Sequence, residues 1–438
     1  MSDSVPRIWL TTLGCAKNQV DSEKITARLG AAGYREADGP EDADVVMINT
    51  CGFIEAARRE SIETVLEAAD AKRPDARLVV VGCMAQRYQS DLADALPEAD
   101  AVIGLERYGE LVADIDDLTG WQPVRLVPPN PMDILYEVRR PVPETPYAYV
   151  KVAEGCDKAC TFCAIPSFRG KQRSRAPVNI REEAAELARA GVGEVVLVAQ
   201  DLAAFGRDID ATGGIVELLR FLSDIEGLRR LRLLYLHPRE VKPGLIEEMA
   251  VNPLVAPYFD LSLQHSASGL LRAMKRPGDA GKHLALIEAI RRADPGAALR
   301  SSFIVGFPGE RETDVDLLEE FLAEARLDWA GFFAFSAEEG TPAADLPGRV
   351  DDEAVGERLR RLQALQDEIT AEKSTEQVGR EVAVLVDQVE EGVPVGRSYR
   401  EAPEIDGMIL LDRGEPGEWL QARITGSYGA DTTAEVIE

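Results

Sequence analysis

The first hundred residues alternate between short apolar runs and longer amphipathic segments. Three runs rich in Val, Ile and Leu end near residues 14, 50 and 82, and helical patterns follow them at 20–29, 53–69 and 85–96. Short β-branched runs without polar alternation are typical of strands buried on both faces of a parallel sheet. The pattern therefore predicts a doubly wound α/β domain over residues 1–121.

A second alternation begins at Tyr147. We expect six strands, at 148–152, 194–199, 230–236, 258–263, 299–305 and 329–335. Helical patterns lie between them at 181–190, 215–225, 270–274, 283–293 and 313–325. Six βα units are fewer than the eight of a closed barrel. The pattern therefore predicts a partial (βα)6 TIM-like barrel over residues 147–350.

The remaining segments have a different character. Seven prolines between Trp121 and Tyr147 break both helix and sheet, which indicates a linker at 122–146. A charged helical stretch at 351–375 connects the barrel to the last segment. Residues 376–438 alternate in the manner of strands, at 380–389, 408–411, 420–426 and 432–437, which predicts a small β-barrel.

The composition of the chain indicates which classes of partner it can bind. The chain of 438 residues carries a formal net charge of −28, and phosphate binding depends on clustered cations, so a basic partner suits it better than nucleic acid. No apolar run approaches the roughly 20 residues that span a bilayer, and the first residues lack the pattern of a signal peptide. We expect a cytoplasmic protein with no membrane partner, in which six cysteines are too few for a disulfide scaffold.

Three of the six cysteines lie within eight residues. Cys156, Cys160 and Cys163 have the spacing C-x3-C-x2-C, and none of the three histidines of the chain is nearby to complete a tetrahedral zinc site. Soft thiolates on a short loop suit an iron–sulfur cluster, and three ligands leave one iron without a protein ligand. Chance packing of buried cysteines is the alternative, but half of the cysteines in one loop argue against it.

The other three cysteines are far apart in sequence. Cys15, Cys51 and Cys83 each follow one of the apolar runs of the first domain. Parallel strands end at the same edge of a sheet, so the three thiols are expected to share that edge. Ordinary packing remains an alternative for any single one, whereas three equivalent positions favour a second cluster.

Polar residues follow other predicted strands. Gln200, Gln264 and His265 are expected at the mouth of the partial barrel, where each can position a cofactor or satisfy backbone groups in a core. A basic run, with cations at 169, 171, 173 and 175, follows the cysteine loop. Such a run usually marks a solvated face, and its place beside the loop also allows an electrostatic role toward substrate or reductant.

Several segments resemble the radical S-adenosylmethionine (SAM) methylthiotransferase family over essentially the whole chain. They are the C-x3-C-x2-C loop, GCAKNQVDSE at 14–23, NTCGFI at 49–54 and APEIDG at 402–407. The last three resemble the RimO branch, which modifies the β-carbon of an aspartate in ribosomal small-subunit protein twelve. The resemblance implies a methylthiotransferase domain, a radical SAM domain and a C-terminal TRAM domain.

The resemblance also implies the cofactors. Cys156, Cys160 and Cys163 would hold one 4Fe–4S cluster that binds SAM, and Cys15, Cys51 and Cys83 a second one. Phe162 lies where the family contacts adenine, and Gly306 and Gly309 lie in a turn like the one that cradles adenosine. Gln264 and His265 are our further candidates for cofactor binding. The family uses one SAM to methylate a cluster-bound sulfur and another to form a 5′-deoxyadenosyl radical, which requires a low-potential electron donor.

Two alternatives stay open. A tRNA adenosine methylthiotransferase of the MiaB branch needs a basic TRAM domain, whereas residues 376–438 hold five Arg, no Lys and fourteen acidic residues. A balance of −9 fits a basic ribosomal protein, and we expect no strong tRNA binding. A non-catalytic electron-transfer module would not need the barrel-like units and the glycine turn.

Overall fold

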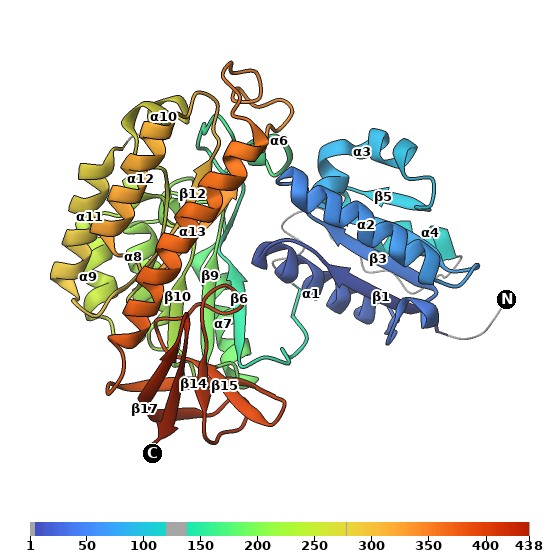
Figure 1. The fold of residues 1–438 in the computed structure, drawn as a ribbon. Coiled ribbons are helices and arrows are strands. Elements are labelled where there is room, and N and C mark those ends of the chain that lie inside the picture. The colour runs from blue at the N-terminus through green and yellow to red at the C-terminus, as the bar shows by residue number, and fades with distance from the viewer. Residues whose placement is uncertain (1–4, 120–137, 277, 438) are drawn as a thin grey trace. The chain divides into compact units, whose positions relative to one another are not determined.

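The structure is a computed structural model that describes residues 5–119, 138–276 and 278–437 (Figure 1). The chain forms two compact units. The first unit comprises residues 1–142 with the short segments 154–157 and 163–175, and the second comprises 143–153, 158–162 and 176–438. Most of the predicted proline-rich linker, residues 122–137, lies outside the described residues.

The first unit contains a five-stranded parallel sheet. Its strand order is β2-β1-β3-β4-β5. The strands are β1 (Arg7–Thr12), β2 (Arg35–Glu36), β3 (Val45–Thr50), β4 (Arg77–Gly82) and β5 (Ala101–Ile103). The helices are α1 (Ala16–Ala31), α2 (Glu55–Ala71), α3 (Cys83–Ala95) and α4 (Leu111–Thr119), with 3₁₀ turns at Pro40–Asp42 and Leu105–Arg107.

Helices cover both faces of this sheet. Val45 and Met47 of β3 pack in one apolar cluster with residues of α1 and α4. Val46 and Ile48 point to the other face and pack with α2 and α3. This alternation confirms the predicted doubly wound architecture. The short segments of the unit include β8 (Arg173–Ser174) and α6 (Ile165–Phe168), and β7 is Ala153–Glu154.

The second unit contains six parallel strands in two three-stranded sheets. The orders are β10-β9-β6 and β11-β12-β13, and isolated bridges from Leu231 to Val255 and from Leu236 to Leu261 connect the β10 edge to the β11 segment. The strands are β6 (Tyr147–Lys151), β9 (Glu194–Val198), β10 (Arg230–Leu233), β11 (Tyr258–Gln264), β12 (Ala298–Val305) and β13 (Trp329–Ala334). A partial barrel of six strands is therefore confirmed.

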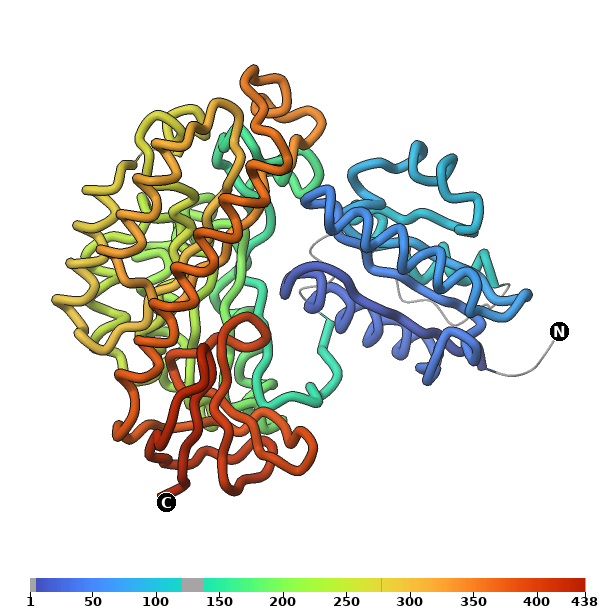
Figure 2. Tube along the Cα trace, in the orientation of Figure 1, coloured from blue at the N-terminus to red at the C-terminus, as the bar shows by residue number. Residues whose placement is uncertain are grey.

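Helices surround these strands and enclose one large apolar core. They are α7 (Pro177–Arg189), α8 (Gly214–Leu222), α9 (Pro243–Val251), α10 (Ser268–Ala273), α11 (Ala280–Ala293) and α12 (Glu312–Ala325). 3₁₀ turns lie at Leu202–Ala204 and Pro238–Glu240. In Figure 2 the long helix α13 (Asp352–Thr375, orange) runs along this unit toward the red C-terminal segment.

The C-terminal segment is a closed barrel with the order β14-β15-β16-β18-β17. Its strands are β14 (Glu381–Glu390), β15 (Val393–Arg397), β16 (Ile409–Leu411), β17 (Trp419–Tyr428) and β18 (Asp431–Val436). It packs against the amino ends of the parallel strands. Arg397 donates to Glu194, the first residue of β9, at 3.0 Å, and Trp329, the first residue of β13, donates its indole N–H to the Arg400 carbonyl at 2.9 Å. The carboxyl ends of the strands, where barrels carry their chemistry, lie at the opposite end of the unit.

Among the helices of the described residues, none is both long and apolar enough to cross a bilayer.

Candidate metal centres and cofactor site

The three dispersed cysteines meet at one edge of the first sheet. Cys15, Cys51 and Cys83 come just after β1, β3 and β4, which are adjacent in the sheet. Each strand delivers its cysteine to the start of the following helix or loop. The sheet topology therefore places the three thiols as the sequence pattern predicted.

Two glycines allow the loops that carry these thiols to touch. A Cβ added to Gly14 would lie 2.8 Å from the Cβ and 2.9 Å from the Sγ of Cys51. A Cβ added to Gly52 would lie 2.9 Å from the carbonyl oxygen of Cys83. Contacts this short are not tolerated, so any larger residue would push the thiols apart.

Asn18 of α1 connects the same loops. Its side-chain amide donates to the carbonyls of Leu13 at 2.9 Å and Thr50 at 3.2 Å. Its Oδ1 accepts a hydrogen bond from the Cys83 thiol at 3.5 Å. This residue was not among the site residues expected from the sequence, although it lies in the GCAKNQVDSE segment.

The thiols differ in how readily they ionise. Burial opposes ionisation of Cys15, but Lys17 and Arg169 outweigh it and hold the pKa of that thiol below its usual value. Burial raises the pKa of Cys51 to about 12, and the neighbouring Cys83 and Cys15 charges add to the rise. A metal centre binds thiolates, so its binding would have to displace the proton that the buried Cys51 thiol keeps in the metal-free protein.

The donor set fits a cluster better than a single ion. Within the described residues, no three His, Cys, Asp or Glu side chains are arranged to hold one metal ion. A four-iron cluster takes each thiolate on a different iron, which spaces its ligands more widely than one ion does. Three soft thiols without a nearby histidine suit that geometry.

The second cysteine set lies on a loop after β7. Cys156, Cys160 and Cys163 are all partly exposed. Lys158, between the first two, forms ion pairs with Glu240 at 2.6 Å and Asp201 at 3.3 Å. Both acids follow strand ends of the partial barrel, so they fix this point of the loop to its carboxyl edge.

Phe162 and the glycine turn lie together. Phe162 packs against an apolar cluster that includes Phe307 and Met274. Phe307 belongs to the turn after β12 in which Gly306 and Gly309 have φ angles of 82° and 86°. The structure thus brings together the residues for which the sequence predicted adenosine binding, and their contact with a cofactor remains a prediction.

Gln264 is the last residue of β11, and His265 follows it. Gln264 is half-buried with φ of 72°. His265 is fully buried, and its Nδ1 accepts the backbone N–H groups of Ser266 at 2.9 Å and Ala267 at 3.0 Å. This pattern places the ring proton on Nε2, which lies 3.6 Å from the Glu310 carboxylate.

Glu310 in turn accepts the Gly306 N–H at 3.0 Å and pairs with Arg358 at 2.8 Å. Glu310 therefore fixes the glycine turn, and His265 lies beside this carboxylate. The predicted contact of His265 with the cofactor stays a prediction.

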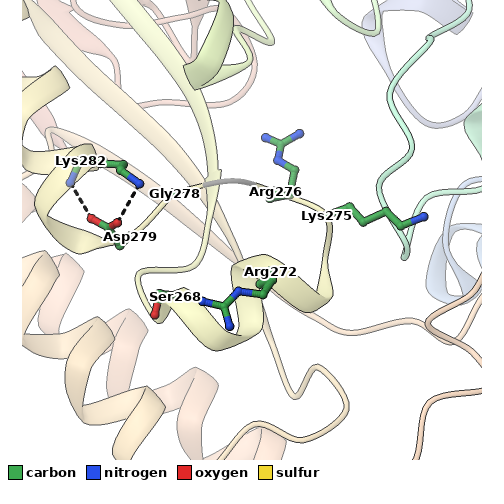
Figure 3. Close-up of a pocket in the computed structure, with 7 residues that line it drawn as sticks. All are labelled: Ser268, Arg272, Lys275, Arg276, Gly278, Asp279 and Lys282. Carbon is green, nitrogen blue, oxygen red and sulfur yellow. Dashed lines mark hydrogen bonds and ion pairs between the residues drawn. The ribbon is translucent and has the colours of Figure 1, made fainter.

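A basic pocket of about 360 Å³ opens after β11 (Figure 3). Arg272, Lys275, Arg276 and Lys282 line it, with Asp279 as its acidic residue. Lys282 pairs with Asp279 at 3.2 Å. Composition did not predict such a pocket in this acidic chain.

Two of its cations are distinguished by their contacts. Arg276 is buried and lies 3.6 Å from the Cys160 Sγ. The Arg272 side chain is exposed and has no hydrogen-bond or ion-pair partner within residues 5–119, 138–276 and 278–437. The pocket can therefore take an anionic group close to the cysteine loop.

The basic run after the cysteine loop is not a solvated face throughout. Lys171 and Arg173 are exposed, but Arg169 and Arg175 are each only 3% exposed. Burial alone would lower the pKa of Arg169, but neighbouring negative charges, first that of Cys83 and then that of Glu154, hold this pKa well above its usual value. The solvated interpretation is wrong for these two arginines because both are buried, and the partners of Arg169 include Cys83 and Asp21, which are distant in sequence.

Comparisons with known families match three regions. Residues 7–104 match the uncharacterized protein family UPF0004, 150–322 the radical SAM superfamily and 378–437 the TRAM domain. Among solved structures, the radical SAM methyltransferase TsrM from Kitasatospora setae has a TM-score of 0.54 at 14% identity, over 78% of this chain and 77% of that one. This likeness supports the fold.

Relatives of known name match over nearly the whole length. The ribosomal protein uS12 methylthiotransferase RimO of Saccharopolyspora erythraea is 42% identical over 98% of this chain and 95% of its own. The RimO of Moorella thermoacetica is 46% identical over 96% and 97%. The radical SAM match implies that the chain uses SAM and a 4Fe–4S cluster. The chain belongs to the RimO family of radical SAM methylthiotransferases, and it is an enzyme of that family.

Proposed function

We propose that this chain adds a methylthio group to the β-carbon of an aspartate of ribosomal protein uS12, using two 4Fe–4S clusters and SAM. The observation that carries the proposal is the meeting of Cys15, Cys51 and Cys83 at the ends of three adjacent strands. A radical SAM enzyme that only cleaves SAM needs the C-x3-C-x2-C loop alone. The additional three thiols, those of Cys15, Cys51 and Cys83, support the insertion of sulfur.

The six cysteines divide into two ligand sets. When bound, a 4Fe–4S cluster at Cys156, Cys160 and Cys163 supplies the electron that cleaves SAM, and a second one at the first set supplies the site that holds the sulfur. Three thiolates in each set leave one iron free of protein ligands. Lys158 pairs with Glu240 and so fixes its own point of the loop at the carboxyl edge of the strands.

The remaining candidates bind and orient the cofactor. Phe162 and the turn from Gly306 to Gly309 provide an apolar surface and open backbone for the adenosine of SAM. Gln264 offers an amide at the end of β11. Glu310 keeps that turn in place, and His265 lies 3.6 Å from its carboxylate.

The charge of the C-terminal barrel supports a protein substrate. Its nine excess acidic residues suit a basic ribosomal protein and would repel RNA phosphates. The names of the relatives agree with this choice. A low-potential electron donor is the other partner that the chemistry requires.

We divide the chain into five segments. Residues 1–121 form the methylthiotransferase domain, 122–146 a linker and 147–350 the radical SAM barrel. Residues 351–375 form the connecting helix, and 376–438 the TRAM barrel. The family matches at 7–104, 150–322 and 378–437 support this division.

The substrate is tested by mass spectrometry of uS12 and of tRNA from cells with and without the gene. We expect the uS12 aspartate to lose its methylthio group in cells without the gene, and tRNA to remain unchanged. Loss of a methylthio group from tRNA with uS12 unchanged would instead assign the chain to tRNA modification.

The division between the two sets is tested by two variants. Cys160→Ala is expected to abolish formation of 5′-deoxyadenosine from SAM, whereas Cys51→Ala should retain this cleavage and lose methylthio transfer. Thr161→Ser is a matched control, because serine keeps the hydroxyl that donates to the Ala273 carbonyl at 2.8 Å. The reconstituted wild-type chain should hold about eight irons; equal loss of cleavage in both folded variants, or about four irons, would contradict the division.

A further inference from the structure

Arg169 is a deeply buried cation of the first unit, only 3% exposed. Its side chain is 1% exposed, and it lies in the segment 163–175 that packs within this unit. It is the sixth residue after Cys163. The family chemistry assigned above gives it no task.

Two N–H groups of Arg169 point at one sulfur. Nε lies 3.2 Å and Nη2 lies 2.9 Å from the Sγ of Cys83. The planar guanidinium presents these two donors along one edge, as it does toward a carboxylate. The sulfur therefore occupies the place that a carboxylate usually takes.

The other donors of Arg169 are held by helix α1 and by Glu154, the last residue of β7. Nη1 donates to Glu154 at 2.8 Å and lies 3.4 Å from Asp21. Nη2 also donates to Asn18 Oδ1 at 2.7 Å. These contacts fix the plane of the guanidinium, so its Nε edge faces Cys83.

We propose that Arg169 is a positioning residue that orients Cys83 and raises the reduction potential of the iron–sulfur cluster at Cys15, Cys51 and Cys83. The inference rests on the proposed function, because that function places a cluster on these thiols. N–H donors and a positive charge at a ligating sulfur withdraw electron density from it. They stabilise the reduced form, which carries one more negative charge.

The test isolates this cluster in the full-length Cys160→Ala chain, which lacks a ligand of the other set. Anaerobically reconstituted protein is titrated with dithionite, and the reduced cluster is followed by electron paramagnetic resonance. Arg169→Gln should shift the midpoint potential to a more negative value, and Arg169→Lys should shift it less, because lysine keeps the charge but loses the paired donors. Lys171→Gln is the matched control: it removes an exposed charge two residues away and should cause no shift.

A potential that stays unchanged in Arg169→Gln with full iron content would overturn the inference. A second measurement needs no substitution at Arg169. With ¹⁵N-labelled arginine, the reduced cluster in the Cys160→Ala chain should show nitrogen hyperfine coupling across the N–H···S bonds, and absence of this coupling would also overturn the inference. Absence of any iron from that chain would overturn the proposed second cluster, and this inference with it.

Discussion

Each of the two units buries a group of charged side chains that includes arginine. The two groups differ in which side chains the arginines contact. In the second unit, Glu194 accepts Arg232 at 2.6 Å, Arg397 at 3.0 Å and Arg230 at 3.2 Å. In the first unit, Arg169 donates to carboxylates, an amide and the Cys83 thiol, as described above. Both groups are nearly inaccessible to solvent.

The difference shows that buried charge alone does not identify chemistry. Glu194 lies at the amino end of β9, and its partner Arg397 also pairs with Asp387 at 2.5 Å. These contacts join the C-terminal barrel to the parallel strands through carboxylates, guanidiniums and backbone carbonyls such as that of Ser398, without a thiol. The Arg169 group includes the Cys83 thiol, a proposed cluster ligand, which is why we assign this arginine a role toward a cofactor.

The largest effect on stability is expected for Glu194→Gln. This substitution leaves three guanidiniums close together in the interior without their shared carboxylate, and breaking a buried pair costs about 3–5 kcal/mol in the free energy of unfolding. Chemical denaturation of the purified chain measures the loss. The iron content of the folded fraction should not change, and a loss of iron without loss of stability would break the comparison.

The stability that Glu194 contributes is expected to depend on pH. Burial opposes ionisation of Glu194, but Arg232, Arg397 and Arg230 outweigh it and lower its pKa to about 2. A depressed pKa contributes stability that is fully present above the unfolded value of about 4.3 and is lost as the pH falls toward about 2. The difference in unfolding free energy between wild type and Glu194→Gln should therefore be constant from pH 8 to 6 and shrink below about pH 4. Denaturation curves at pH 7, 5, 4 and 3 measure it, and a difference that grows on acidification would contradict the assignment.

The smallest effect is expected at an exposed pair of the C-terminal barrel. Arg423 and Glu381 lie 2.6 Å apart, but both side chains are about half exposed, at 54% and 53%. Water screens such a pair, so Arg423→Ala should change the unfolding free energy by less than about 0.5 kcal/mol. A loss as large as that of Glu194→Gln would mean that burial does not separate the two kinds of ion pair.

The regular elements were largely predictable from the sequence. The strand expected at 194–199 is Glu194–Val198, and the helix expected at 313–325 is Glu312–Ala325. Long β-branched runs and helical periods define such elements locally. Strand β5 (Ala101–Ile103) was missed because three residues show no period, and β15 (Val393–Arg397) because Pro394 and Gly396 interrupt its pattern.

The candidate site was predictable only where the strand topology determines which residues come together. Parallel topology brings Cys15, Cys51 and Cys83 to one edge, so their meeting followed from their positions after strands. The burial of Arg169 did not follow, because its partner Cys83 is 86 residues away in sequence. A charge run looks the same whether it faces water or a distant thiol.

The attachment of the C-terminal barrel determines how far it lies from the cysteine loop along the parallel strands. Strands β6 and β12 have five and eight residues, so the two ends of the parallel strands lie roughly 15 to 25 Å apart at about 3.3 Å per residue. Glu194 and Trp329 fasten the barrel to one end, while Lys158 holds the cysteine loop at the other. For the proposed function, a target that contacts the barrel must span this distance to place its aspartate at the cysteine loop.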